Sequence, residues 1–169
     1  MPLHLYEGLS GRLITTILKA KRFTGTQMLA VLQRLVKHLR HAWPDTLVIF
    51  RGDSHFAYPE VMQWIDKQPA LHYVTGLTSN AVLKELAREV VEQAQRAYAS
   101  SGRKVTRFHS TRYQAQPGAR ARRVVIKGEV SEQGVNTRFV VTDMEQARTQ
   151  VLYQHLYCRR GQAENYIKA

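Results

Sequence analysis

The chain has 169 residues, 44% of them hydrophobic, which is enough for one domain with a substantial core. Its net charge of +12 favours a polyanionic partner, either nucleic acid or an anionic membrane surface. No segment is long and apolar enough to span a bilayer, and the N-terminus lacks the apolar core of a signal peptide. These observations predict a cytoplasmic protein, and the lone cysteine, Cys158, excludes an internal disulfide.

The first half of the chain is expected to form a hairpin followed by alternating helices and strands. Gly8 and Gly11 mark the turn of the hairpin, and Pro44 ends the first helix. The expected elements are strands at 2–8 and 12–19, a helix at 25–43, a strand at 47–53, a helix at 58–67 and a strand at 72–77. This alternation predicts a mixed sheet with covering helices.

A long helix is expected next, capped by Ser79 or Asn80 and running to about Ala99. Residues 93–128 then contain no Asp or Glu and nine Lys or Arg. Strand-like stretches lie at 105–113, 122–130 and 137–142. Such segregated charge favours binding to the DNA backbone, with Arg120, Arg122 and Arg123 as candidate contacts, although basic side chains also protect exposed strand edges from aggregation.

Two motifs suggest chemistry. The short apolar run in residues 47–53 (LVIFRGD) ends at Asp53, as expected for a buried strand that delivers a carboxylate at its C-terminal end. Near the other end, Tyr157, Arg160 and Glu164 follow the spacing Y-x2-R-x3-E. Steps of three and four residues place a phenol, a guanidinium and a carboxylate on one helix face, which suits a phosphodiester and a metal ion.

Together these motifs resemble the DDE-type transposases of bacterial insertion sequences, in their Y-x2-R-x3-E signature group. The resemblance runs from Pro2 to Ala169. It implies an α/β fold: an incomplete ribonuclease-H-like mixed sheet with flanking helices, and a β-rich basic insertion before the catalytic helix. Asp53, followed by Ser54-His55-Phe56, is similar to the family's second aspartate, and Glu164 to its glutamate.

The resemblance also implies an activity and its partners. Asp53 and Glu164 would be the catalytic and metal-binding residues for two Mg²⁺ or Mn²⁺ ions that support DNA strand cleavage and transfer. Tyr157 and Arg160 would contact the DNA end, with Arg159 and Lys168 adding phosphate contacts. The partners would be insertion-sequence ends and target DNA in a bacterial, nucleoid-associated protein, with a homodimer in the intact family and no membrane contact. His55 suits either a DNA contact or a satisfied loop position.

Two parts of the family pattern have no counterpart in the sequence. The first catalytic aspartate would precede the hairpin, and the only acids before Asp53 are Glu7 and Asp45, neither placed at the end of a strand like a metal ligand. A lysine of the signature would fall at position 171. The expectation is therefore a fragment truncated at both ends and inactive alone. Its expected parts are a core at 1–78, a helix with the basic insertion at 79–143, and the catalytic helix at 144–169.

Two other classes of function remain open at this point. A DNA-binding module without chemistry would hold a duplex with the basic insertion and the terminal helix, and metal-dependent quenching at Asp53 and Glu164 would distinguish the enzyme from it. A basic RNA-binding protein would show stacking aromatics in a strand motif, and the sequence has none.

Overall fold

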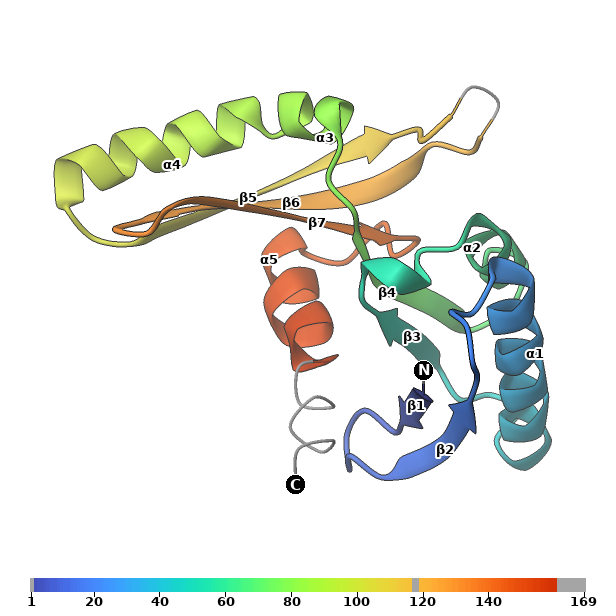
Figure 1. The fold of residues 1–169 in the computed structure, drawn as a ribbon. Helices are drawn as coiled ribbons and strands as arrows, with labels where there is room; N and C mark the ends of the chain where they lie inside the picture. Colours follow the sequence, from blue (N-terminus) through green and yellow to red (C-terminus); the bar gives the residue numbers. More distant parts are fainter. Residues whose placement is uncertain (1, 117–118, 161–169) are drawn as a thin grey trace.

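A five-stranded mixed sheet organises the molecule, with a separate two-stranded hairpin beside it (Figure 1). This computed structural model describes residues 2–116 and 119–160. Its elements are β1 (Pro2–Tyr6), β2 (Leu13–Leu18), α1 (Gly25–Ala42), β3 (Val48–Gly52), η1 (Ser54–Phe56), α2 (Pro59–Ile65), β4 (Leu71–Leu77), α3 (Ala81–Leu86), α4 (Arg88–Ser101), β5 (Val105–Tyr113), β6 (Arg122–Ser131), β7 (Gly134–Thr142), α5 (Thr149–Val151), η2 (Leu152–Tyr157) and η3 (Cys158–Arg160).

The sheet has the strand order β3-β4-β7-β6-β5. Only β3 and β4 are parallel, because α2 connects them, while β4–β7, β7–β6 and β6–β5 pair antiparallel. The predicted mixed α/β fold class is confirmed. Because β4 pairs with β7, the sheet is continuous from the first half of the chain into the β-rich insertion.

Alternation along the central strands explains how the sheet buries both of its faces. In β6, Val124 and Ile126 face the larger core, which also contains residues of α1, α2, α3 and α4. Val125, between them, faces the smaller core with Leu152 and Tyr153 of η2. Successive strand side chains point to opposite faces, so one apolar run supplies both cores.

Local sequence signals account for most helix boundaries. Thr24 and Gln27 form a capping box at the start of α1, Pro59 occupies the first turn of α2, and the Asn80 side chain accepts the Leu83 N–H at 2.9 Å. The single long helix expected after Asn80 is two helices. The boundary is at Ala87, whose backbone nitrogen donates to the carbonyl oxygens of both Leu83 at 3.0 Å and Lys84 at 3.2 Å. After this residue, α4 lies along β5 and β6 (Figure 1).

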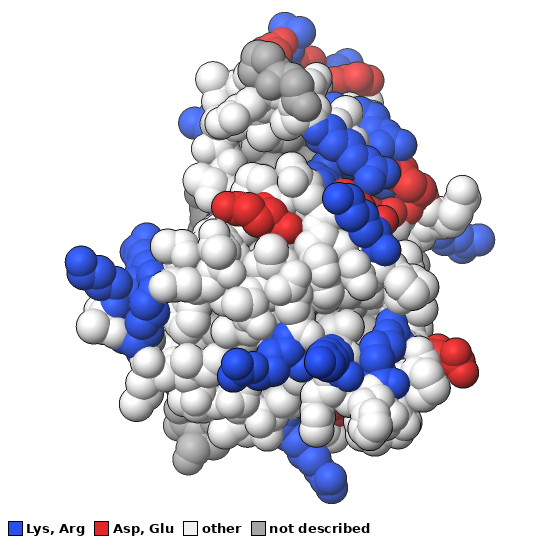
Figure 2. All heavy atoms as spheres, turned by 90° about the vertical axis from the view of Figure 1, so that its right-hand side faces the viewer, with Lys and Arg blue, Asp and Glu red and all other residues white. Residues whose placement is uncertain are grey.

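Figure 2 shows the side of the molecule on which α1 lies, where Lys and Arg side chains stand in separate groups with Asp and Glu among them. Arg40, in the last turn of α1, donates at 2.9 Å to the carbonyl oxygens of both Pro69 and Ala70. This arginine therefore anchors the loop before β4. Within the described part of the chain, no helix is long and apolar enough to cross a membrane.

Candidate catalytic edge

Asp53 directly follows β3, at the carboxyl end of the parallel pair β3–β4, which is where ligands bind in α/β sheets. Its Oδ1 accepts the His55 N–H at 2.8 Å and lies 3.2 Å from His55 Nδ1. The Asp53 side chain is 39% exposed and that of His55 is 58% exposed. The loop thus orients the carboxylate while leaving it open to a ligand from solvent.

Tyr157 reaches the same point from the other end of the sequence. A Cβ atom added at Gly76 of β4 would lie 2.7 Å from the Tyr157 hydroxyl oxygen and 2.8 Å from the Ser54 backbone nitrogen. The tyrosine hydroxyl and the Asp53–Ser54 backbone therefore both lie against Gly76. The glycine permits this approach because it has no side chain to fill the space.

Arg51 holds three segments together at this edge. Its Nη1 donates to the Leu156 carbonyl oxygen of η2, and its Nη2 donates to the Gly8 carbonyl oxygen, both at 3.2 Å. Burial lowers the pKa of Arg51, and the nearby Arg159 charge lowers it further, whereas Glu7 opposes the shift. The exposed Arg159 side chain therefore lies near the charged end of β3.

Glu7 follows β1 and belongs to the hairpin turn. Its carboxylate accepts the N–H groups of Leu9 at 2.8 Å and Ser10 at 2.5 Å. Hydrogen bonds from the Ser10 side chain and backbone lower the pKa of Glu7 to about 2. The turn therefore uses this carboxylate, which directly follows β1 and does not lie within the strand as expected from the sequence.

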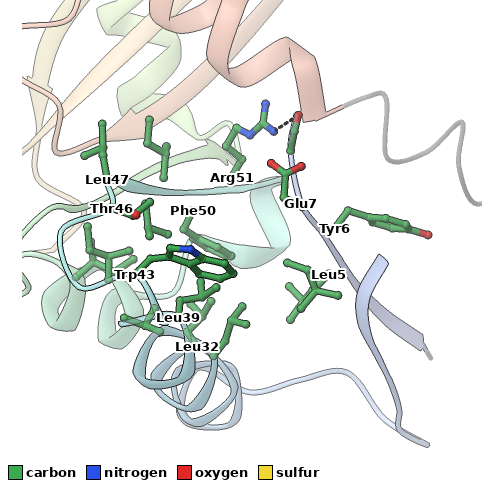
Figure 3. Close-up of a pocket in the computed structure, with 18 of the residues that line it drawn as sticks. Leu5, Tyr6, Glu7, Leu32, Leu39, Trp43, Thr46, Leu47, Phe50 and Arg51 are labelled. Carbon is green, nitrogen blue, oxygen red and sulfur yellow. Dashed lines mark hydrogen bonds between the residues drawn. The ribbon is translucent and has the colours of Figure 1, made fainter. Parts of the chain in front are cut away.

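A groove of about 430 Å³ separates β1 from β3 (Figure 3). Leu5 lines it from the hairpin, Phe50 from β3 and Leu39 from α1, while Trp43 and Leu47 stand at its border, 60% and 56% exposed. In the described chain, β1 pairs with β2 alone and β3 with β4 alone. Each strand thus has an edge without a ladder partner.

The helix that carries Tyr157 departs from the expected α-helical geometry. It begins at Thr149, has π-helical hydrogen bonding in η2, and ends in a 3-10 turn over Cys158–Arg160. Tyr153 and Tyr157 nonetheless share one side, with ring centroids 5.5 Å apart. The Arg160 side chain lies outside the described structure, as do residues Glu164 and Lys168, so the predicted grouping of Tyr157, Arg160 and Glu164 stays a prediction.

Arg122 is engaged inside the protein. Its Nη1 lies 2.9 Å from Asp66 Oδ2 and donates to the Tyr73 hydroxyl oxygen at 2.6 Å, and the side chain is 10% exposed. Burial raises the pKa of Tyr73 well above its ordinary value. This cluster joins α2, β4 and β6, which gives Arg122 a structural role. Arg120 also contacts Asp66, at 3.1 Å, but it is 65% exposed and keeps a surface for an anion.

Arg123 is buried on the opposite side of β6. Its Nη1 donates to the carbonyl oxygens of Met144, Glu145 and Ala147 at 2.6, 3.0 and 2.8 Å. The guanidinium therefore holds the loop that leads from β7 to α5. With these three carbonyl partners and further hydrogen bonds from its other nitrogens, it is not arranged as a phosphate contact.

Sequence reasoning missed Arg51 and Gly76, although both left a signal. Gly76 interrupts an apolar strand, which often marks a close approach of backbone or ligand. Arg51 is a charge inside the otherwise apolar run before Asp53. Buried charges need partners, so an arginine at this position could have indicated that its side chain bonds to other segments of the fold.

Asp53 is the one predicted metal ligand whose surroundings the structure describes. Across residues 2–116 and 119–160, no group of three or more His, Cys, Asp or Glu side chains could hold a metal ion. A partly exposed carboxylate at a strand end still fits Mg²⁺ or Mn²⁺, because hard cations prefer carboxylate oxygens and retain water.

The family model for transposase DDE domain group 1 matches residues 1–169, the whole chain. The chain belongs to this transposase family. No curated protein and no solved structure gave a significant match. Family membership assigns the transposase to DNA transposition, and with it DNA as the general class of substrate. The resemblance drawn from the two sequence motifs is thereby confirmed.

Proposed function

We propose that this transposase domain contributes Asp53 as a metal-binding carboxylate for cleavage and transfer of DNA strands. The observation that carries the proposal is the convergence of the Tyr157 hydroxyl and the Asp53–Ser54 backbone on Gly76. A carboxylate for a cation and a phenol for a phosphate oxygen thus share the carboxyl edge of β3 and β4. Phosphodiester cleavage by divalent ions uses carboxylates to hold the cations, and a phenol can donate a hydrogen bond to a phosphate oxygen.

The residues have separate roles in this proposal. Asp53 holds one divalent cation from the end of β3, and Glu164 supplies a second carboxylate. When bound, Mg²⁺ or Mn²⁺ ions stabilise the attacking and leaving oxygens of an in-line displacement. Tyr157 donates a hydrogen bond to the DNA end, and Arg159, Arg160 and Lys168 contact its phosphates.

A third carboxylate is needed for full activity, and we propose that it is supplied by a strand seated between β1 and β3. Support comes from the groove between these strands, whose apolar lining suits a half-buried strand and whose two edges can pair with it. A strand parallel to β3 would end beside Asp53. Residues 1–169 alone would then lack one ligand and would not cut DNA.

The proposal extends to the biological partners. The DNA substrates are insertion-sequence ends and target DNA, the active form is a homodimer, and the protein is associated with the bacterial nucleoid. A DNA-binding module without chemistry is the alternative. The two differ in whether a divalent ion binds at Asp53.

Titration with Mn²⁺ followed by electron paramagnetic resonance tests the proposal. Residues 1–169 should remove free Mn²⁺ from solution, and Asp53→Asn should weaken this uptake. Asp45→Asn, which removes an acid from the loop after α1, is the matched control and should bind Mn²⁺ like the wild type. Equal uptake by all three proteins would favour the module without chemistry.

A further inference from the structure

The long antiparallel part of the sheet has one covered and one open face. Helix α4 packs on β5 and β6 on one side, whereas the opposite side carries α5 and η2 near the candidate catalytic edge and, among residues 2–116 and 119–160, no other helix (Figure 1). We call this second side the open sheet face. Its side chains, assigned by alternation from Val125 and Val140, are Thr106 and Phe108 of β5, Lys127 and Glu129 of β6, and Asn136 and Arg138 of β7.

The open sheet face is continuous with the candidate catalytic edge. Tyr153 packs between the two, with its ring centroid 5.5 Å from that of Tyr157 and 5.4 Å from that of Phe108. Lys127 Nζ lies 5.9 Å from the Tyr153 ring, and the strand register places Phe108, Lys127 and Arg138 side by side. A row of aromatic and cationic groups therefore leads away from Asp53.

The open sheet face carries a net positive charge, which the carboxylate of Glu129 partly neutralises. Glu129 Oε2 lies 2.7 Å from Lys127 Nζ and 3.1 Å from Lys104 Nζ. Hydrogen bonds from Lys127 first, and from Lys104, lower the pKa of Glu129 to about 2. Lys104 is 63% exposed and Arg138 is also exposed, whereas the side chains of Lys127 and Glu129 are only 16% and 12% exposed. Two lysines thus contact one carboxylate, and Arg138 is a further cation on the same face.

We propose that the DNA duplex flanking the cleaved bond lies along the open sheet face, with its phosphates on the exposed cations Lys104 and Arg138. Glu129 competes with phosphate for Lys104 and so limits the affinity. The orientation of the duplex rests on the proposed function, because the row of aromatic and cationic side chains begins at the candidate catalytic edge. Charge complementarity identifies the occupant, since a flat basic face suits a duplex backbone.

The strand geometry gives the inference a length scale. Gly76 pairs with Val140, and Val140 with Val125, so the catalytic edge lies at the level of Val125. Glu129 is four residues further along β6, about 13 Å at a rise of about 3.3 Å per residue. Because β6 lies two strands from β4, a further step of about 10 Å crosses the sheet, and the direct separation is about 16 Å. DNA advances about 3.4 Å per base pair, which places the contact at Glu129 and Lys104 about five base pairs from the catalytic edge.

Fluorescence anisotropy tests this surface with residues 1–169 and a labelled duplex of about 20 base pairs, roughly two helical turns. The assay omits divalent ions, so failure of the metal chemistry at Asp53 does not affect it. The double variant Lys104→Ala, Arg138→Ala should bind at least tenfold more weakly at about 0.1 M salt and lower the salt slope by about two. Arg107→Ala is the matched control, because Arg107 is an exposed cation of β5 on the face toward α4. It should change affinity less than about twofold, since it offers the duplex no phosphate contact.

Glu129→Gln supplies the opposite test. Freeing two lysines and removing one negative charge should raise duplex affinity several-fold and steepen the salt slope. The inference is overturned if Arg107→Ala weakens binding as much as the double variant, or if Glu129→Gln folds and binds no more tightly. It is also overturned if single-stranded DNA or RNA binds as tightly as the duplex. Should Glu129→Gln fail to fold, the comparison of the double variant with Arg107→Ala decides.

Discussion

The hydroxyl of Tyr157 lies against Gly76, 2.7 Å from where a Cβ atom at that position would stand. The Ser54 backbone nitrogen lies 2.8 Å from the same point. A tyrosine from the last helix and the loop that carries Asp53 therefore meet over a single glycine of β4. This contact connects the two sequence motifs in space.

Gly76→Ala should destabilise the fold, because the new methyl group meets both the Tyr157 hydroxyl and backbone that cannot rotate away. Overpacking of this kind costs about 1–3 kcal/mol, measured as a change in the free energy of unfolding by urea. Gly128→Ala is the control, since its nearest neighbour lies at 3.4 Å and leaves more room. Adding Tyr157→Phe to Gly76→Ala should restore part of the loss. Equal costs at both glycines would contradict the close approach.

Arg123→Ala should destabilise the protein by roughly 2–4 kcal/mol, because it removes a buried guanidinium and the hydrogen bonds with which it holds the loop before α5. Arg120→Ala should change the free energy of unfolding by about 0.5 kcal/mol or less, since its ion pair is largely exposed. Chemical denaturation of both variants checks the contrast. A stably folded Arg123→Ala protein with weakened DNA binding would instead make Arg123 a phosphate contact.

Glu129 should give the protein an acid-sensitive contribution to stability. Its pKa is lowered from an ordinary value of 4.5 to about 2 in the folded protein. A group with a lowered folded pKa stabilises fully above its unfolded pKa and loses this contribution as pH falls toward the folded value. The stability difference between wild type and Glu129→Gln should therefore shrink between pH 4.5 and pH 2. A difference independent of pH in urea titrations would exclude the lysine contacts as its source.

Residues 1–169 should not cut or join DNA strands with Mg²⁺ or Mn²⁺, because Asp53 and Glu164 leave one metal position poorly held. Adding an upstream segment that forms a strand ending in Asp, and extending the C-terminus, should be required for activity. The strand should also cover Trp43 and shift its fluorescence to shorter wavelength, measured in a Trp64→Phe background. Metal-dependent nicking by residues 1–169, abolished by Asp53→Ala, would show that the third ligand comes from elsewhere.

The sequence predicted those parts of the fold that depend on local patterns. Alternating strands, a helix cap at Ser79 or Asn80 and the strand end at Asp53 were all readable, because each follows from side-chain periodicity or backbone chemistry over a few residues. The structure selects Asn80 as the cap. The division of the long helix at Ala87 was not readable. It arises from packing of α3 and α4 against the sheet, and alanine itself favours a continuous helix.

Tertiary contacts also decided which charges are available to DNA. Arg120, Arg122 and Arg123 lie close together in an acid-free stretch, yet only Arg120 is exposed. The partners of the other two, Asp66 and the loop before α5, are distant in sequence. Likewise, the π-helical geometry of η2 follows no residue pattern, so spacing arguments based on an α-helix did not describe it.

Iron-mediated cleavage of the protein backbone tests the central claim most directly. Fe²⁺ bound in place of Mg²⁺, with ascorbate and peroxide, produces hydroxyl radicals that cut the chain near the metal. We expect fragments from cuts beside Asp53, at Gly76 and near Tyr157, all suppressed by excess Mg²⁺ and lost in Asp53→Asn. Cuts elsewhere, or an unchanged pattern in Asp53→Asn, would contradict a metal site at this edge.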